Sequence, residues 1–218
     1  MSKSDTFFKY GKIYISKNYN LFMDIKNTII EALLNRNKIQ SREEILKLVE
    51  NYRNKFQIKS SKDILKYLSR HKYITRIFQG YYYINSFDER IRGFYNLKDH
   101  EIIFMTLNKM NLDWYVGMDY SIYLQGKTWQ TPSQISIINT KFNGNKKIFG
   151  LKVRFFKINN SLLFGLKKKA TSNKIEFLYS DPAKTYLDMV YFKQSKILTR
   201  VKNTQRYLKR YPKWVGEK

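Results

Sequence analysis

The chain has 218 residues, of which 43% are hydrophobic and 17% aromatic, enough for one or two folded domains. Lys and Arg number 42 against 17 Asp and Glu, and the net charge of +25 favours a polyanionic partner such as nucleic acid over a cationic one. Cysteine is absent, which excludes disulfides, thiolate zinc sites and cysteine nucleophiles, and two histidines are too few for a multi-histidine metal site.

The sequence also lacks membrane, secretion and cofactor signals. It has no apolar run of about 18 residues, the length that indicates a transmembrane helix. Its first residues, MSKSDTFFKY, lack the apolar core of a secretory signal. Glycine motifs for phosphates, dinucleotides or a hydrolase nucleophile are missing as well. We therefore expect a soluble, cytoplasmic protein without membrane contact, cofactor, bound metal or enzymatic activity.

The N-terminal part predicts an arm and three helices. Residues 1–20 are aromatic and basic without a helical period, which predicts an extended arm. A three-four spacing of apolar residues predicts a helix over 21–35. A second helix begins at Ser41, which forms a capping box with Glu44 ahead of an apolar stripe. A third begins near Ser60 or the next serine, whose hydroxyl is expected to cap it.

The third helix is amphipathic and leads into a hairpin. At 100° per residue, Ile64, Leu65 and Leu68 share one side, opposite a basic side. The period then changes to two, and Gln79-Gly80 supplies a two-residue turn. Three helices followed by a hairpin is the order of a winged helix-turn-helix domain, which we assign to residues 21–86. A protein-interaction module with the same order is the alternative.

In a winged helix, the third helix enters the major groove and the hairpin, or wing, contacts the neighbouring backbone. The residues expected to contact DNA are Lys59, Ser60, Ser61, Lys62, Lys66, Arg70, Lys72, Arg76 and Gln79. An ordinary helix with a solvated lysine face is the plainer interpretation of the same charges.

Residues 87–192 predict a mixed α/β domain, separated from the first by a short polar joint at 85–88. The expected elements are helices over 98–110 and 120–124, strands over 114–117, 135–138 and 152–156, a turn at 143–145, a loop at 167–169 and a helix that begins at Pro182. The predicted fold class is α+β, with an N-terminal winged helix-turn-helix, a mixed α/β domain and a basic C-terminal helix.

Two carboxylates lie seven residues apart on the helix that begins at Pro182. Asp181 is explained as the helix cap, and Asp188 comes two turns later. With a further acid, Asp188 could hold a divalent metal, as a nuclease requires. No convincing partner acid is found, so a salt bridge or backbone contact is the favoured interpretation.

Residues 193–218 form a second cationic segment. They hold nine basic residues against Glu217, a net charge of +8, and predict a helix over 196–209. The candidate residues for a second nucleic-acid or partner surface are Lys196, Arg200, Lys202, Arg206, Lys209 and Arg210.

Three segments, in chain order, resemble the AbiEi family. Residues 73–84, YITRIFQGYYYI, resemble its wing, and 114–126, WYVGMDYSIYLQG, look like its strand and short helix that ends in glycine. Residues 180–190, SDPAKTYLDMV, are similar to its S-x-P-x-K-x-x-L-D helix. The resemblance implies a transcriptional repressor and antitoxin. Its winged helix would bind inverted repeats in its own promoter, where a homodimer fits, and its second domain would counteract a nucleotidyltransferase toxin encoded next to it.

The same resemblance gives the Pro182 helix with Asp188 a structural role and no catalytic one. The arm and the basic tail after Lys193 depart from the family pattern, which bears on toxin neutralisation more than on DNA binding. Two alternatives stay open. One is a solitary regulator without a toxin. The other is a protein that coats RNA or DNA without sequence preference, with aromatics such as Trp129, Tyr81 and Tyr82 stacking on bases.

Overall fold

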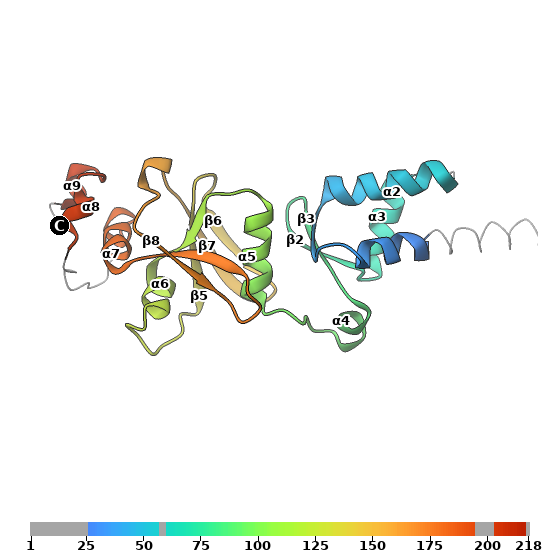
Figure 1. The fold of residues 1–218 in the computed structure, drawn as a ribbon, viewed down its shortest axis with the longest axis horizontal. Coiled ribbons are helices and arrows are strands. Elements are labelled where there is room, and N and C mark those ends of the chain that lie inside the picture. The colour runs from blue at the N-terminus through green and yellow to red at the C-terminus, as the bar shows by residue number, and fades with distance from the viewer. Residues whose placement is uncertain (1–25, 57–59, 195–202, 217–218) are drawn as a thin grey trace, which may run out of the picture. The chain divides into compact units, whose positions relative to one another are not determined.

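The computed structural model describes residues 26–56, 60–194 and 203–216 (Figure 1). The chain divides into two compact units, Met1–Asn96 and Leu97–Lys218, here called unit 1 and unit 2. Both contain helices and strands, so the predicted α+β class is confirmed. The predicted arm over 1–20 lies outside the described residues.

Unit 1 consists of helices and a small antiparallel sheet. Its elements are a helix over 26–34, β1 (Ile39–Ser41), α2 (Arg42–Phe56), α3 (Ser61–Arg70), β2 (Ile74–Phe78), β3 (Tyr81–Ile84) and α4 (Phe87–Arg92). The sheet has the strand order β1-β3-β2, with all pairs antiparallel. Strand β1 was not predicted, because three residues are too few to display a period of two.

The apolar faces of the three helices meet in one core against the sheet. The buried residues of this core are Ile29, Ile30, Leu33, Ile45, Leu48, Val49, Ile64, Leu68, Ile74 and Ile84. The predicted capping box of α2 is confirmed: the amide of Ser41 donates to Glu44 Oε2 at 2.8 Å, and the amide of Glu44 donates to Ser41 Oγ at 3.1 Å. Helix periodicity and a local cap therefore position α2 as expected.

A single buried carboxylate holds α4 in unit 1. Glu89 accepts hydrogen bonds from Lys38 Nζ at 2.7 Å, the Tyr83 hydroxyl at 2.5 Å and the amide of Asn96 at 2.9 Å. Because these contacts fix the segment after β3 to the first sheet, the unit boundary falls after Asn96. This division lies about ten residues after the predicted joint at 85–88, where Ser86 caps α4.

Unit 2 is built on a six-stranded mixed sheet. Its elements are α5 (Asp99–Lys109), β4 (Trp114–Val116), α6 (Met118–Leu124), β5 (Gln134–Asn139), β6 (Gly144–Ile148), β7 (Leu151–Lys157), η1 (Asn160–Leu162), β8 (Leu166–Ala170), β9 (Glu176–Ser180), α7 (Pro182–Tyr191), α8 (Gln205–Leu208) and α9 (Lys213–Gly216). The strand order is β6-β7-β5-β4-β9-β8, in which β5 pairs with β7 and β4 with β9 in parallel.

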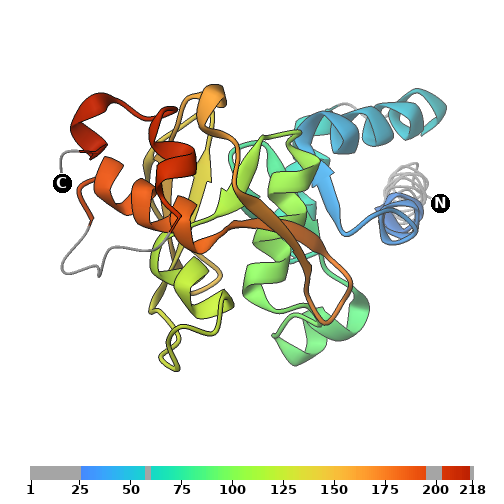
Figure 2. The ribbon, with the colours of Figure 1, turned by 60° about the vertical axis from the view of Figure 1, so that its left-hand side comes forward.

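Helices cover both faces of this sheet (Figure 2). On one face, Phe104 of α5 packs against Trp114 and Phe177, with ring centroids 5.1 and 4.7 Å apart. On the other face, Tyr115 and Ile138 belong to a core shared with α7. Adjacent residues of β4 thus point to opposite layers, as the pleat of a strand requires. This alternation positions Tyr115 under α7.

Several predicted boundaries in unit 2 are wrong. The expected turn at 143–145 lies at the start of β6, and the hairpin instead turns at Phe149 and Gly150, whose φ angles are 49° and 92°. The lysines at 167–169 lie in the edge strand β8 and not in a loop. Where the structure describes the predicted helix over 196–209, it has only the four-residue α8, and the second short helix α9 follows it.

The sequence predicts no transmembrane helix, and the length and apolarity of the helices bear on this expectation. Within the described ranges, none of the helices combines the length and apolarity that crossing a bilayer demands.

Candidate nucleic-acid interface

The exposed side of α3 is basic, and its other side is part of the unit 1 core. Lys62, Lys66 and Arg70 are exposed, whereas Ile64 and Leu68 each retain only 1% of their accessible surface. Successive basic residues lie four positions apart, so they follow one another along a single stripe. Three of the predicted contact residues therefore face solvent together, while Lys59 lies outside the described residues.

One acidic neighbour approaches this stripe. Asp63 Oδ1 lies 4.0 Å from Lys66 Nζ, and the two side chains are 69% and 83% exposed. An ion pair this long and this solvated contributes little, about 0–1 kcal/mol at most. Lys66 therefore remains able to exchange Asp63 for a phosphate.

The two serines at the start of α3 do not behave as predicted. Ser60 occupies the N-cap position, but its hydroxyl makes no capping hydrogen bond. The Ser61 hydroxyl instead donates to Glu50 Oε2 on α2 at 2.6 Å. Ser61 therefore fixes α3 to α2 and does not offer a free hydroxyl to DNA. The tertiary structure explains this difference, because the Glu50 carboxylate that it brings to Ser61 is a stronger hydrogen-bond acceptor than any local group.

The hairpin after α3 presents the remaining predicted contacts. Arg76 and Gln79 are exposed, and Gly80 adopts the positive φ of 82° that the predicted tight turn requires. Arg76 Nε donates to the carbonyl of Phe78 at 3.4 Å, which holds the guanidinium along the hairpin. Lys72 is exposed in the turn between α3 and β2. Lys72, Arg76 and Gln79 thus add exposed polar groups on the turn and hairpin that follow α3.

Two of the predicted C-terminal cations make contacts within unit 2. Arg206 donates to Asp181 Oδ2 at 2.7 Å, and the Arg210 guanidinium lies 4.6 Å from the centre of the Phe164 ring. Both arginines thus help to hold α8 on unit 2. Lys209 is exposed, whereas Lys196, Arg200 and Lys202 lie outside the described residues. The predicted second surface is therefore, where it is described, partly engaged within the protein.

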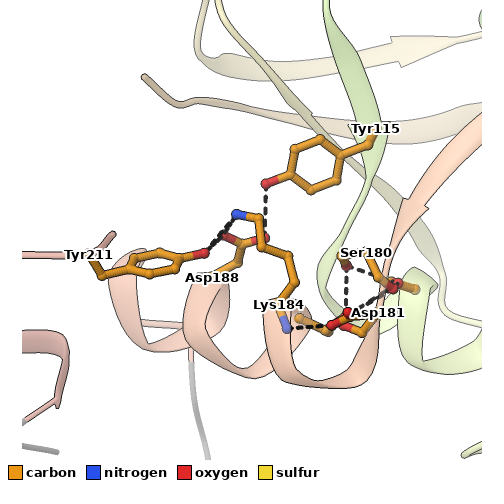
Figure 3. A network of polar contacts seen from close by, with 8 residues as sticks. Tyr115, Ser180, Asp181, Lys184, Asp188 and Tyr211 are labelled. Atoms are coloured by element: carbon orange, nitrogen blue, oxygen red, sulfur yellow. Dashed lines mark hydrogen bonds and ion pairs between the residues drawn. The ribbon is translucent and has the colours of Figure 1, made fainter. Parts of the chain in front are cut away.

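A buried ion pair lies on α7 (Figure 3). Lys184 Nζ lies 2.5 Å from Asp188 Oδ1, and both side chains are fully buried. The hydroxyls of Tyr115 and Tyr211 also donate to Asp188, at 2.9 and 2.6 Å. The predicted salt bridge of Asp188 is confirmed. The role of Tyr211 was missed, since no local pattern connects it to a helix 23 residues earlier.

Burial governs the protonation of this pair. Removal from water raises the pKa of Asp188 and lowers the pKa of Lys184, and the attraction between the two groups opposes both shifts. The Asp188 carboxylate already accepts from Lys184, Tyr115 and Tyr211. With its acceptor positions engaged, Asp188 is not presented to a metal ion. In the described ranges, no cluster of three or more His, Asp or Glu is arranged to hold one.

Neutral hydrogen bonds connect the start of α7 to α6. The Ser121 hydroxyl and the Gln125 amide donate to the carbonyl of Ser180 at 2.8 and 2.9 Å, and Gln125 also donates to Thr185 Oγ1 at 3.0 Å. Asp181 caps α7 by accepting from the amide of Lys184 at 2.8 Å, as predicted. Two of the segments that carry the family resemblance, 114–126 and 180–190, therefore form one packed structure.

A comparison with known proteins adds no identification: no family model matches the chain, and no curated protein matches it.

Proposed function

We propose that the chain is a DNA-binding transcriptional repressor that represses its own operon and acts as the antitoxin of a nucleotidyltransferase toxin. The exposed basic stripe of α3, opposite the buried Ile64 and Leu68, is the observation that carries the DNA-binding part. A helix that is fixed by its apolar side and basic on its free side has the form of a recognition helix.

The arrangement of unit 1 supports a winged helix-turn-helix. The order helix, β1, α2, α3, β2, β3, with β3 between the other strands, is the order expected of that domain. In it, α3 would enter the major groove, and the β2–β3 hairpin would be the wing that contacts the adjacent backbone through Arg76 and Gln79. An inverted repeat would be bound by two copies of the chain, one on each half-site.

The DNA-binding proposal predicts that Lys62→Glu with Lys66→Glu weakens binding to the duplex upstream of the gene at least about tenfold, because a lost base contact costs about 1–3 kcal/mol and a lost phosphate contact weakens binding to every sequence. The slope of log affinity against log salt should also fall by about 0.9 for each phosphate contact removed. Fluorescence anisotropy with the full chain measures both quantities, and far-UV circular dichroism verifies that the variant is folded.

A matched control removes the same charge elsewhere. Lys167 and Lys169 are exposed on β8 of unit 2, outside the proposed DNA-binding surface of unit 1, so Lys167→Glu with Lys169→Glu should leave the affinity for the upstream duplex within about threefold. Equal losses in the two variants, or equal affinity of the parent protein for a random duplex, would instead favour non-specific coating by net charge.

The antitoxin part is supported by the resemblance of 114–126 and 180–190 to the AbiEi family and by their packing through Ser121, Gln125 and Ser180. We expect the full chain to restore growth of cells that express a nucleotidyltransferase encoded beside it. The Lys62→Glu, Lys66→Glu variant should restore growth equally well, because neutralisation is assigned to unit 2. Failure of both proteins to restore growth, with DNA binding intact in the parent, would leave a solitary regulator.

A further inference from the structure

Unit 2 contains a long stretch without any acidic residue. Residues 120–175 hold eleven Lys and Arg and no Asp or Glu. Within this stretch, β5, β6 and β7 form one edge of the sheet. The positive charge on that edge is therefore not neutralised by acidic residues nearby in the sequence. It belongs to unit 2, whereas the basic stripe of α3 belongs to unit 1.

Two lysines of this edge lie directly opposite each other. Lys147 of β6 pairs in register with Lys152 of β7, and both are exposed. Like charges at paired positions repel each other, and neither lysine forms an ion pair with any residue of the ranges that the structure describes. A bound anion would relieve this repulsion. Arg154, two residues along β7, faces the same side of the sheet.

A polar pocket is lined by the strand partner of Lys152. Its volume is about 580 Å³, and it is lined by Asp119, Ile122, Thr128, Gln130, Thr131, Pro132, Ser133 and Gln134. Gln134 begins β5 and pairs in register with Lys152 of the parallel strand β7. Paired residues project to the same face of a sheet, so the pocket wall and the lysine are neighbours.

An exposed aromatic ring lies within the same loop. Trp129, between the pocket residues Thr128 and Gln130, retains 88% of its accessible surface. Tryptophan usually buries its large apolar ring, and this ring has the highest exposure among the large hydrophobic side chains of the described residues. An exposed ring beside amides and hydroxyls, in a loop that leads to Gln134, the strand partner of Lys152, has the stacking surface and polar groups that single-stranded nucleic acid requires.

We propose that unit 2 binds single-stranded nucleic acid at this site, independently of duplex recognition by unit 1. A base stacks on Trp129. Phosphates contact Lys147 and Lys152, and Gln130 and Gln134 hydrogen-bond base edges in the pocket. A duplex is excluded from the stacking contact, because its bases are paired and stacked on one another. The pocket carries one carboxylate, Asp119, which can accept from an amino group of a base.

The test is binding of fluorescent ten-nucleotide oligo(U) and oligo(dT) to the full chain. Trp129→Ala should weaken binding about tenfold or more, since stacking contributes about 1–3 kcal/mol per base. Lys147→Gln with Lys152→Gln should lower the slope of log affinity against log salt by about 1.4, or about 0.7 for each phosphate contact. Binding of either oligonucleotide supports the proposal, and the ratio of the two affinities reports the preferred sugar.

Two controls separate this site from general charge and from the DNA-binding surface of unit 1. Lys167→Gln with Lys169→Gln removes the same charge from the opposite edge strand and should leave the effect of Trp129 unchanged. Lys62→Glu with Lys66→Glu should retain oligonucleotide binding. The proposal is overturned if neither oligonucleotide binds, if Trp129→Ala binds like the parent, or if the α3 variant loses oligonucleotide binding.

Discussion

Replacement of Asp188 by alanine is expected to lower the free energy of unfolding of unit 2 by about 3–5 kcal/mol, because it leaves a buried ammonium group without its partner. Lys184 is fully buried, and among the described residues its other hydrogen-bond acceptor is the hydroxyl of Tyr211, which is neutral. Denaturant unfolding followed by tryptophan emission measures this loss, since all three tryptophans of the chain belong to unit 2.

Two further variants test whether the unpaired buried charge of Lys184 causes this loss of stability. Lys184→Met with Asp188→Leu replaces the pair by apolar side chains and should recover much of the stability, since neither charge is then buried. Glu176→Ala removes the partner of Lys168, in an ion pair of 2.7 Å whose side chains are about 60% exposed, and should cost less than about 1 kcal/mol. If Asp188→Ala costs no more than Glu176→Ala, the buried pair does not stabilise unit 2.

Unit 1 is expected to lose stability in acid through Glu89. Burial opposes ionisation of this carboxyl, but hydrogen bonds from Lys38, Tyr83 and the amides of Ser86 and Asn96 outweigh it and lower the pKa from 4.5 to about 2. The unfolded chain therefore binds the proton first. Stabilisation by Glu89 is fully present above pH 4.5 and is lost as the pH falls from 4.5 towards 2, by about 3 kcal/mol for a shift of about 2.5 units.

The variant Glu89→Gln tests this pH dependence, because the glutamine amide does not titrate between pH 4.5 and 2. The stability difference between the parent and Glu89→Gln should be largest at neutral pH and should shrink below pH 4.5. Unit 1 has no tryptophan, so its unfolding appears in far-UV circular dichroism without a change in tryptophan emission. Glu101 is the matched control in unit 2, where hydrogen bonds from Thr171, Asn173 and the Lys98 amide overcome burial and also lower its pKa to about 2. A difference that is independent of pH would contradict the assigned role of Glu89.

Tyr211, which follows the predicted C-terminal helix, illustrates how this part of the chain differs from its sequence pattern. The basic residues of 196–209 suggested a helix with a free cationic face. In the structure, Tyr211 is buried and donates to Asp188, while Arg206 pairs with Asp181. Charge counting could not foresee this, because the acidic partners lie about 25 residues earlier and are brought to the tail only when α7 packs on the sheet.

The sequence by itself determined the elements whose signals are local. The apolar spacing of α2, α3, α5 and α7, the cap at Ser41, the Asp181-Pro182 start and the Gln79-Gly80 turn each depend on residues within a few positions of one another. The tertiary structure alone decided the edge strands β6 and β8, whose exposed lysines have no alternating pattern, and the very short β1. It also decided the partners of Ser61, Glu89 and Asp188, because a buried polar group is paired by whichever chain segment folding brings to it.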